Sequence, residues 1–349
     1  MTTMNDTISA RAGGPLLDIR DLVVELPGPD GTPLRALDGV NLTVERGEIV
    51  GLAGESGSGK TMTALALLGL LPQGGTARGE MRVEGRDVLS MTPRQVRDLR
   101  GNKVAMVFQD PMTSLHPMLS VGKQLTEHLR HHKKLGKKAA NARAAELLAT
   151  VRIPDPEQAL KRYPHQFSGG MRQRIAIAVA LACDPDLLLA DEPTTALDVT
   201  VQAGILRLLD RLRRENGLSV LIITHDLGVM SALADRVSVM YAGRIAETGP
   251  RAEVLRTPRH PYTRGLLDAL PHPGAGTTAL LPIPGSPPKL GLAPSGCAFH
   301  PRCPFAVDAC AGDRPELLPL TELHATACPV DPLADRTSPE TETTEAGAR

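Results

Sequence analysis

The sequence is poor in aromatic residues, and this scarcity narrows the functions that are open to the protein. Its 349 residues include no tryptophan, three tyrosines and four phenylalanines, which together make up 2% of the chain. Proteins that bind single-stranded nucleic acid stack the bases on aromatic rings, so a surface of that kind is not expected. Lysine plus arginine number 39, as do aspartate plus glutamate, so the formal net charge is zero. Because nucleic-acid binding usually shows as a basic excess, we predict no nucleic-acid partner.

Long apolar runs are also missing. The longest are Ile175–Cys183 and Val220–Ile223, whereas a membrane-spanning helix needs about 20 apolar residues. Residues 1–14 lack the apolar segment of a secretory signal, which favours a cytosolic chain in which disulfides are rare. We expect residues 1–14 and the polar tail 332–349 to be disordered.

The pattern of apolar residues predicts an α/β fold with a parallel sheet. Short apolar runs between turn residues predict strands over residues 15–55, followed by a helix over 60–71. Residues 119–163 are mostly helical in pattern, and a helix is expected over 171–183. Further along, we expect a buried strand at 187–190, a helix over 199–216 and a strand at 219–224.

The composition changes beyond about residue 256. Residues 271–296 contain seven prolines, and four of the five cysteines lie between 297 and 328. We therefore predict two units, a main domain over 15–255 and a separate, loop-rich extension over 256–331.

A phosphate-binding loop is predicted directly after the apolar run that ends at residue 53. Residues 54–61 match the pattern G-x-x-x-x-G-K-[ST] between a strand and a helix, although a glycine-rich turn alone could also look like this. In such a loop the backbone N–H groups face the phosphates, the lysine reaches the β- and γ-phosphates, and the hydroxyl holds Mg²⁺. The expected nucleotide-binding residues here are Gly54, Glu55, Ser56, Gly57, Ser58, Gly59, Lys60, Thr61 and Met62.

A pair of carboxylates follows the apolar strand at 187–190. Asp191 stands where a phosphate-loop enzyme places a carboxylate beside Mg²⁺, next to Thr61. Glu192 could deprotonate a water in line with the γ-phosphate, as a general base does. Taken alone, an Asp-Glu pair after a strand is more often a helix cap, but the phosphate loop favours the catalytic interpretation.

Four further motifs follow in an order that resembles the ATP-binding-cassette (ABC) ATPases. Phe167–Arg174 resembles the signature sequence of that family, and Val107–Pro111 resembles its Q-loop. Thr195–Asp198 is similar to the D-loop, and Ile223–Asp226 to the switch-histidine segment. The resemblance implies a P-loop ATPase core with a small β subdomain and a helical subdomain.

The resemblance also implies roles for individual residues. Gln109 would contact Mg²⁺ and the attacking water, and His225 would contact the γ-phosphate and hold Glu192 in register. The signature residues and the D-loop would serve a second nucleotide site, on the ATP bound by an opposing subunit. Simple helix capping is the alternative for the serine. The residues concerned are Ser168, Gly169, Gly170 and Asp198.

One departure from the family concerns the base. ABC ATPases commonly stack an aromatic residue from the early strand region on adenine, but Leu22–Leu26 and the turn after it contain none. The contacts to adenine are therefore left open.

The C-terminal part is similar to one branch of the family. His260–Thr263 and the cysteine-rich segment resemble the ATPase subunits of bacterial oligopeptide and dipeptide importers, a branch that includes nickel importers. This resemblance implies an ATP-hydrolysing subunit on the cytoplasmic face of the inner membrane. Its implied partners are integral-membrane permease subunits, a paralogous ATPase or a second copy, and, through the permease, an extracytoplasmic solute-binding protein. The alternative is a soluble ABC ATPase that acts on ribosomes or DNA, although such proteins usually carry two cassettes or a long coiled coil.

Four cysteines lie within 32 residues, whereas Cys183 stands alone on an apolar helix and is predicted to be part of the core. Their spacings match neither the usual structural zinc motif nor the common ferredoxin patterns. A metal would still supply folding energy to a segment with little apolar core. A [4Fe–4S] cluster, zinc and unligated thiols all remain open for Cys297, Cys303, Cys310 and Cys328.

Overall fold

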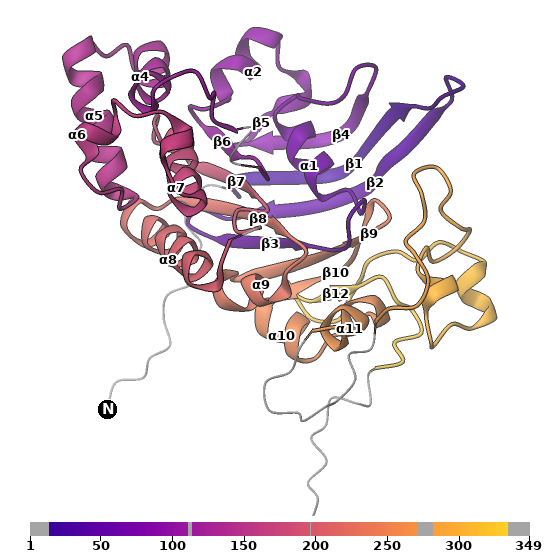
Figure 1. Cartoon of the computed structure of the whole chain (residues 1–349). Helices are drawn as coiled ribbons and strands as arrows, with labels where there is room; N and C mark the ends of the chain where they lie inside the picture. The colour runs from indigo at the N-terminus through magenta and orange to yellow at the C-terminus, as the bar shows by residue number, and fades with distance from the viewer. Residues whose placement is uncertain (1–13, 111–113, 196, 271–281, 334–349) are drawn as a thin grey trace, which may run out of the picture.

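The computed structural model describes residues 14–110, 114–195, 197–270 and 282–333 (Figure 1). Its larger sheet contains the strands β3 (Ile49–Ala53), β6 (Val104–Val107), β7 (Leu187–Asp191), β8 (Ser219–Thr224), β9 (Arg236–Tyr241), β10 (Arg244–Pro250), β11 (Leu318–Pro319) and β12 (Ala325–Thr326). Their order is β11-β12-β10-β9-β3-β8-β7-β6. The strands from β9 to β6 pair in parallel, and β10, β11 and β12 add antiparallel pairs at one end.

A smaller antiparallel sheet forms the β subdomain. It consists of β1 (Leu17–Pro27), β2 (Pro33–Val44), β4 (Thr76–Val83) and β5 (Arg86–Asp87), in the order β2-β1-β4-β5. Apolar side chains of β1 and β2, such as Ile19 and Leu42, pack with Leu67 and with one face of the larger sheet. The two sheets therefore share a core.

The helices lie around the larger sheet, and α4, α5 and α6 gather on the side away from the C-terminal segment (Figure 1). Their bounds are α1 (Lys60–Leu67), α2 (Pro93–Leu99), α4 (Val121–His132), α5 (Lys137–Thr150), α6 (Pro156–Ala159), α7 (Gly169–Ala180), α8 (Val199–Asn216), α9 (Leu227–Leu233), α10 (Arg251–Arg256) and α11 (Pro261–Asp268). Within the described ranges, no helix is long and apolar enough to cross a membrane.

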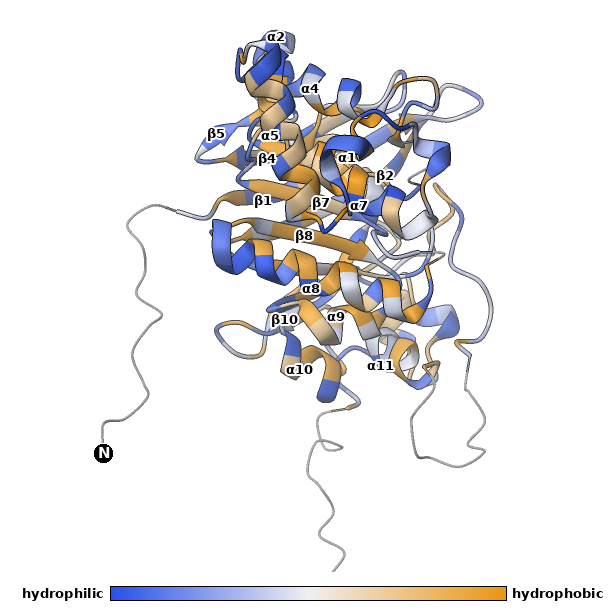
Figure 2. Cartoon of the chain, turned by 60° about the vertical axis from the view of Figure 1, so that its left-hand side comes forward, coloured by the Kyte–Doolittle hydropathy of each residue, from blue (hydrophilic) through white to orange (hydrophobic). Residues whose placement is uncertain are grey.

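Successive side chains of β8 point to opposite faces of the larger sheet, so the strand contributes to two hydrophobic cores. Val220 and Ile222 pack with the layer of α4, α5, α7 and α8, whereas Leu221 and Ile223 point to the opposite face and pack with the β subdomain. Strand β8 is accordingly among the most hydrophobic segments in Figure 2, whereas α8 mixes apolar and polar residues. A strand buried on both faces reads as one apolar run, as this one does.

Most of the predicted elements agree with the structure. The helix at 199–216 and the strand at 219–224 have the predicted bounds. The helix predicted over 60–71 ends at Leu67, because Gly69 adopts a left-handed φ of 59° that stops the helix. The helix predicted over 171–183 runs from Gly169 to Ala180 instead.

The C-terminal extension contributes strands to the larger sheet. Strand β12 pairs with β10, so the extension completes the edge of the larger sheet. Leu333, inside the tail predicted to be disordered, is buried. The rest of that tail and residues 1–13 lie outside the described residues.

A buried carboxylate on β10 fastens the extension to the main domain. Glu247 is fully buried and accepts hydrogen bonds from the backbone N–H groups of Arg259 (2.8 Å) and His260 (3.0 Å). Its Oε1 also lies 2.8 Å from Nε2 of His324, in the turn before β12. One side chain thus joins β10 to the segment before α11 and to the extension.

We expect Glu247→Ala to lower the free energy of unfolding by about 3–5 kcal/mol, because buried donors lose their acceptor. The measurement is equilibrium unfolding in urea. Glu253→Ala is the matched control, since its half-exposed carboxylate contacts the other nitrogen of His324 at 3.2 Å. Glu253→Ala should lower the free energy of unfolding by less than about 1 kcal/mol. Equal losses for the two variants would contradict this account of Glu247.

Candidate nucleotide-binding and hydrolysis site

The predicted phosphate loop is a tight turn between β3 and α1, and two glycines make its path possible. Gly54 has φ 147° and Gly59 has φ 109°, both in the region that favours glycine. A Cβ at Gly54 would overlap the backbone oxygen of Met240, and one at Gly59 would overlap the side chain of Leu37. The backbone can therefore wrap closely at both positions only because they carry no side chain.

Lys60 places a buried cation inside this loop. Its side chain is only 7% exposed, and Nζ donates to the backbone oxygens of Gly54 (2.7 Å) and Glu55 (2.9 Å). Burial lowers the pKa of Lys60, while the nearby carboxylates of Glu192, Asp191 and Glu55 raise it. A cation at the start of a helix, within a loop of backbone N–H groups, is an arrangement that attracts phosphate.

Asp191 lies beside the loop, and one of its two carboxylate oxygens is available to bind a ligand. Thr61 Oγ1 donates to Asp191 Oδ2 at 2.9 Å, while the buried Oδ1 has no hydrogen-bond partner among the described residues. Burial raises the pKa of Asp191, and the bond from Thr61 opposes that shift. A hydroxyl and a carboxylate oxygen are ligands of the kind that Mg²⁺ prefers. The two residues therefore fit a Mg²⁺ site.

Glu192 follows Asp191 at the end of β7 and is held in a strained conformation. Its φ is 49°, and its N–H donates to Ile223 O on the adjacent strand β8 at 2.7 Å. Oε1 lies 2.7 Å from Nδ1 of His225, and Oε2 accepts from Thr195 Oγ1 at 2.5 Å. Because β7 and β8 are parallel neighbours, their ends bring Glu192 and His225 together. The arrangement fixes a carboxylate next to an exposed imidazole.

The signature residues are placed elsewhere. Ser168 caps α7, with Met171 N–H donating to its Oγ at 3.3 Å, and Asp198 caps α8, with Val201 N–H donating to Oδ1 at 2.9 Å. The two helix starts are adjacent, since a Cβ on Gly170 would meet the side chain of Val201. Among the residues that the structure describes, no hydrogen bond or ion pair joins Ser168, Gly169, Gly170 or Asp198 to residues 54–62.

The remaining predicted residues flank these groups. Gln109 is exposed, two residues after β6 ends. Ser56, Gly57 and Ser58 complete the loop, and Met62 lies in the first turn of α1. The structure thus brings together Lys60, Thr61, Asp191, Glu192 and His225. Among the described residues, the signature residues make no hydrogen bond to any of these five.

Two residues that contact the loop could not be predicted from the sequence. Tyr262 Oη accepts from the N–H of Glu55 at 2.8 Å, across 207 positions in sequence. Arg302 donates to both oxygens of the Glu55 carboxylate, across 247 positions. No local pattern signals contacts over such separations.

The four clustered cysteines line one small cavity of about 50 Å³ in the extension. Burial raises the pKa of Cys303 and of Cys328 to about 11. All five thiols are free, and Cys183 is buried in the core, as predicted. Within the described part of the chain, no group of three or more His, Cys, Asp or Glu residues is arranged to hold a metal ion.

The parallel sheet, the loop between β3 and α1 and the acidic end of β7 define the class of P-loop nucleotide hydrolases. Comparison with known families narrows the class. Residues 37–195 match the ABC transporter family, and residues 246–310 match the oligopeptide/dipeptide transporter C-terminal region.

Curated relatives match along most of their length. The chain is 49% identical to a probable peptide ABC transporter ATP-binding protein of Sinorhizobium fredii, over 90% of this chain and 94% of the relative. It is 47% identical to the oligopeptide transport ATP-binding protein OppD of Salmonella typhimurium, over 91% and 95% of the two chains. It is 46% identical to the dipeptide transport ATP-binding protein DppD of Bacillus subtilis, over 90% and 94%.

Solved structures agree with this. A bacterial ABC transporter cassette, solved as a dimer, superposes with a TM-score of 0.60 at 28% identity, over 67% of this chain and 98% of that one. The same values hold for a dimeric post-hydrolysis state of an ATP-binding cassette bound to ADP and Pi. The chain belongs to the ABC transporter ATP-binding proteins, in the branch that carries the oligopeptide/dipeptide transporter C-terminal region.

Proposed function

We propose that this chain binds and hydrolyses ATP to energise an ABC importer for peptides or related solutes such as nickel. The observation that carries the proposal is the cluster of Lys60, Thr61, Asp191, Glu192 and His225 at one edge of the parallel sheet. The matched C-terminal region and the names of the relatives support peptide transport. Nothing in them favours the alternative of a soluble ATPase acting on ribosomes or DNA.

In the proposed reaction, Lys60 and the loop N–H groups hold the phosphates of ATP. Thr61 and Asp191 would hold Mg²⁺, which offsets the negative charge of the triphosphate, and Gln109 would contact the same region. Glu192 accepts a proton from the attacking water, and His225 keeps the carboxylate oriented through the contact at 2.7 Å.

We expect Glu192→Gln to cut ATP turnover by about 10²–10⁴-fold, the loss typical of a missing general base, while nucleotide affinity changes by less than about threefold. Steady-state hydrolysis and a nucleotide titration measure the two quantities. Glu215→Gln is the matched control, since that side chain is exposed near the end of α8. Turnover of the Glu192 variant within about threefold of the parent would remove Glu192 from the mechanism.

We further propose that Ser168, Gly169, Gly170 and Asp198 complete the nucleotide site of a second subunit. In the part of the chain that the structure describes, the start of α7 makes no bond to the loop of its own chain, yet it presents N–H groups that can bind an anion. Two subunits facing each other would then enclose two ATP molecules. The proposed second subunit is a paralogous ATPase or another copy of this chain.

Gly169→Asp tests the composite site. A new carboxylate there would repel the γ-phosphate of the facing subunit, so hydrolysis should be lost while the single chain keeps its affinity for ATP. Among the described residues, a Cβ at Gly169 would meet Leu197 at 3.8 Å, an ordinary van der Waals contact, so we expect the variant to fold. Gly136→Asp, at the start of α5 with open space around it, is the matched control and should keep its activity. Full hydrolysis by Gly169→Asp, or by a monomeric sample, would contradict the proposal.

The proposed assembly is peripheral, on the cytoplasmic face of the inner membrane. There the chain would dock on integral-membrane permease subunits, which in turn receive solute from an extracytoplasmic binding protein. The proposed organisation is an ATPase domain over 15–255, with its helical subdomain at about 111–175, and the extension over 256–331.

For the extension we propose a [4Fe–4S] cluster held by Cys297, Cys303, Cys310 and Cys328. One observation supports it: the four thiols line one small cavity. The cluster would supply folding energy to a segment with little apolar core and would take no part in hydrolysis.

Purification without oxygen, followed by iron, sulfide and zinc analysis, tests the cluster. We expect about four irons and four sulfides per chain, as a [4Fe–4S] cluster contains. Bound cysteines should resist alkylation until the iron is removed. A metal-free protein whose extension stays folded would refute the cluster. A content of one zinc per chain would show that the four cysteines hold zinc instead of iron and sulfide.

A further inference from the structure

Glu55, the second residue of the phosphate loop, forms an ion pair with Arg302 of the C-terminal extension. Arg302 Nη1 donates to Glu55 Oε2 at 2.7 Å, and Nη2 donates to Oε1 at 3.0 Å. The ion pair is therefore bidentate. Arg302 is 7% exposed, so the pair is shielded from solvent on its side. Charge pairs of this kind act more strongly than pairs on the surface.

Arg302 is itself fixed in place by further bonds. Its Nε donates to the backbone oxygen of Pro284 at 2.8 Å, and Nη1 also donates to Tyr241 Oη at 3.2 Å. The hydrogen bond with Glu55, and after it the one with Tyr241, raises the pKa of Arg302. The guanidinium is therefore a charged group that is fixed in position beside the loop.

The backbone of Glu55 is held by a second group from beyond β10. Tyr262, on α11, is fully buried, and its Oη accepts the N–H of Glu55 at 2.8 Å. Its ring packs against Tyr241, with centroids 4.6 Å apart, and against Phe299, at 5.3 Å. Three of the seven tyrosine and phenylalanine residues of this chain thus gather behind one residue of the phosphate loop.

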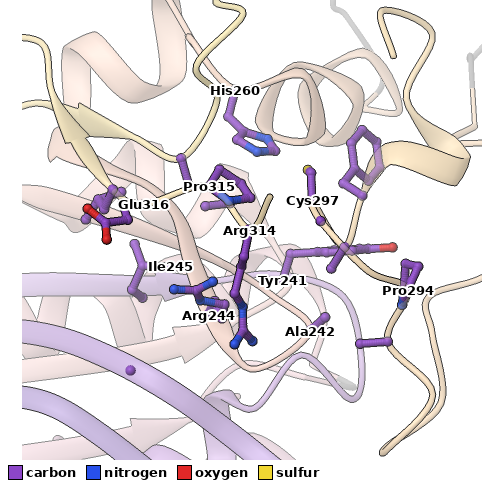
Figure 3. A pocket seen from close by; sticks show the side chains of 18 of the residues that line it. Tyr241, Ala242, Arg244, Ile245, His260, Pro294, Cys297, Arg314, Pro315 and Glu316 are labelled. Atoms are coloured by element: carbon purple, nitrogen blue, oxygen red, sulfur yellow. The ribbon is translucent and has the colours of Figure 1, made fainter. Parts of the chain in front are cut away.

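The same aromatic group borders the cysteine-rich segment. Tyr241, His260 and Cys297 line a cavity of about 650 Å³ between the main domain and the extension (Figure 3). Arg302 ends the short turn His300–Arg302, which is tied to the cysteines on both sides: His300 N–H donates to Cys297 O at 3.0 Å, and Cys303 N–H donates to His300 O at 3.2 Å.

The ion pair between Arg302 and Glu55 would affect how a nucleotide binds in the loop, because Glu55 carries a negative charge. A carboxylate beside a triphosphate repels it, and the Glu55 charge already acts on Lys60, whose pKa it raises. Arg302 offsets that charge and turns both carboxylate oxygens toward the extension. Tyr262 meanwhile fixes the backbone at the point where the loop begins.

We propose that Arg302 and Tyr262 are positioning residues of the nucleotide site, which hold Glu55 neutralised and the loop shaped for ATP. The proposal rests on the function proposed for the loop, since it assumes that ATP binds there. It makes the C-terminal extension a part of the ATPase site. It also means that a change at Cys297 or Cys303 would reach the phosphate loop through one short turn.

Arg302→Met and the double variant Glu55→Gln/Arg302→Met, in the full-length chain, test the proposal. In Arg302→Met an unpaired carboxylate faces the triphosphate, so we expect the Kd and KM for ATP to rise about tenfold, with kcat within about threefold. Removing the charge in the double variant should bring the Kd back to within about threefold of the parent. Arg264→Met is the control, since Arg264 is half-exposed and, among the described residues, forms its ion pair with Asp268 on the same helix, α11.

The results distinguish a role of Arg302 in ATP binding from a role in the fold of the extension alone. An unchanged ATP affinity in Arg302→Met overturns the proposal, and so does a loss that the double variant fails to restore, because Arg302 would then act only on the fold of the extension. If Arg302→Met does not fold, Tyr262→Phe replaces it: the Glu55 N–H loses its acceptor, and the Kd should rise about threefold. No change there also overturns the proposal. A parent protein that binds no ATP would instead refute the proposed function.

Discussion

Parallel hydrogen bonding among β3, β7 and β8 is the constraint on which the rest of the site depends. Because the three strands run in the same direction, their carboxyl ends meet at one edge of the sheet. The loop with Lys60 follows β3, Asp191 ends β7 with Glu192 directly after it, and His225 follows β8. A shift in the register of any one strand would move a phosphate ligand, a Mg²⁺ ligand or the proposed base. These strands are largely apolar and buried on both faces, and this burial holds the register.

The C-terminal extension belongs to the same system. It adds β11 and β12 to the sheet, is fastened at Glu247 and reaches the phosphate loop at Glu55. These contacts explain how residues 282–333, which have little apolar core, are held against the main domain. Cys297 and Cys303 flank the turn His300–Arg302, from which Arg302 reaches Glu55.

Features encoded by short spacings could be predicted from the sequence, and features made by distant contacts could not. The phosphate loop, Asp191 and Glu192 were recognisable because glycine, lysine and carboxylate positions follow directly from local geometry. The early end of α1 depends on the conformation of Gly69, which spacing alone does not reveal. Strands β11 and β12 have two residues each, too few to show alternation. The contacts of Tyr262 and Arg302 with Glu55 exist only once the extension has docked.

The central claim is that residues 54–61 and the ends of β7 and β8 form one ATP-hydrolysing site. An electron cryomicroscopy map of the assembled transporter with Mg²⁺ and a non-hydrolysable ATP analogue tests it most directly. We predict the triphosphate in the loop around Lys60, Mg²⁺ between Thr61 and Asp191, and Glu192 facing the γ-phosphate. A nucleotide bound elsewhere, or Asp191 and Glu192 turned away from its phosphates, would contradict the account.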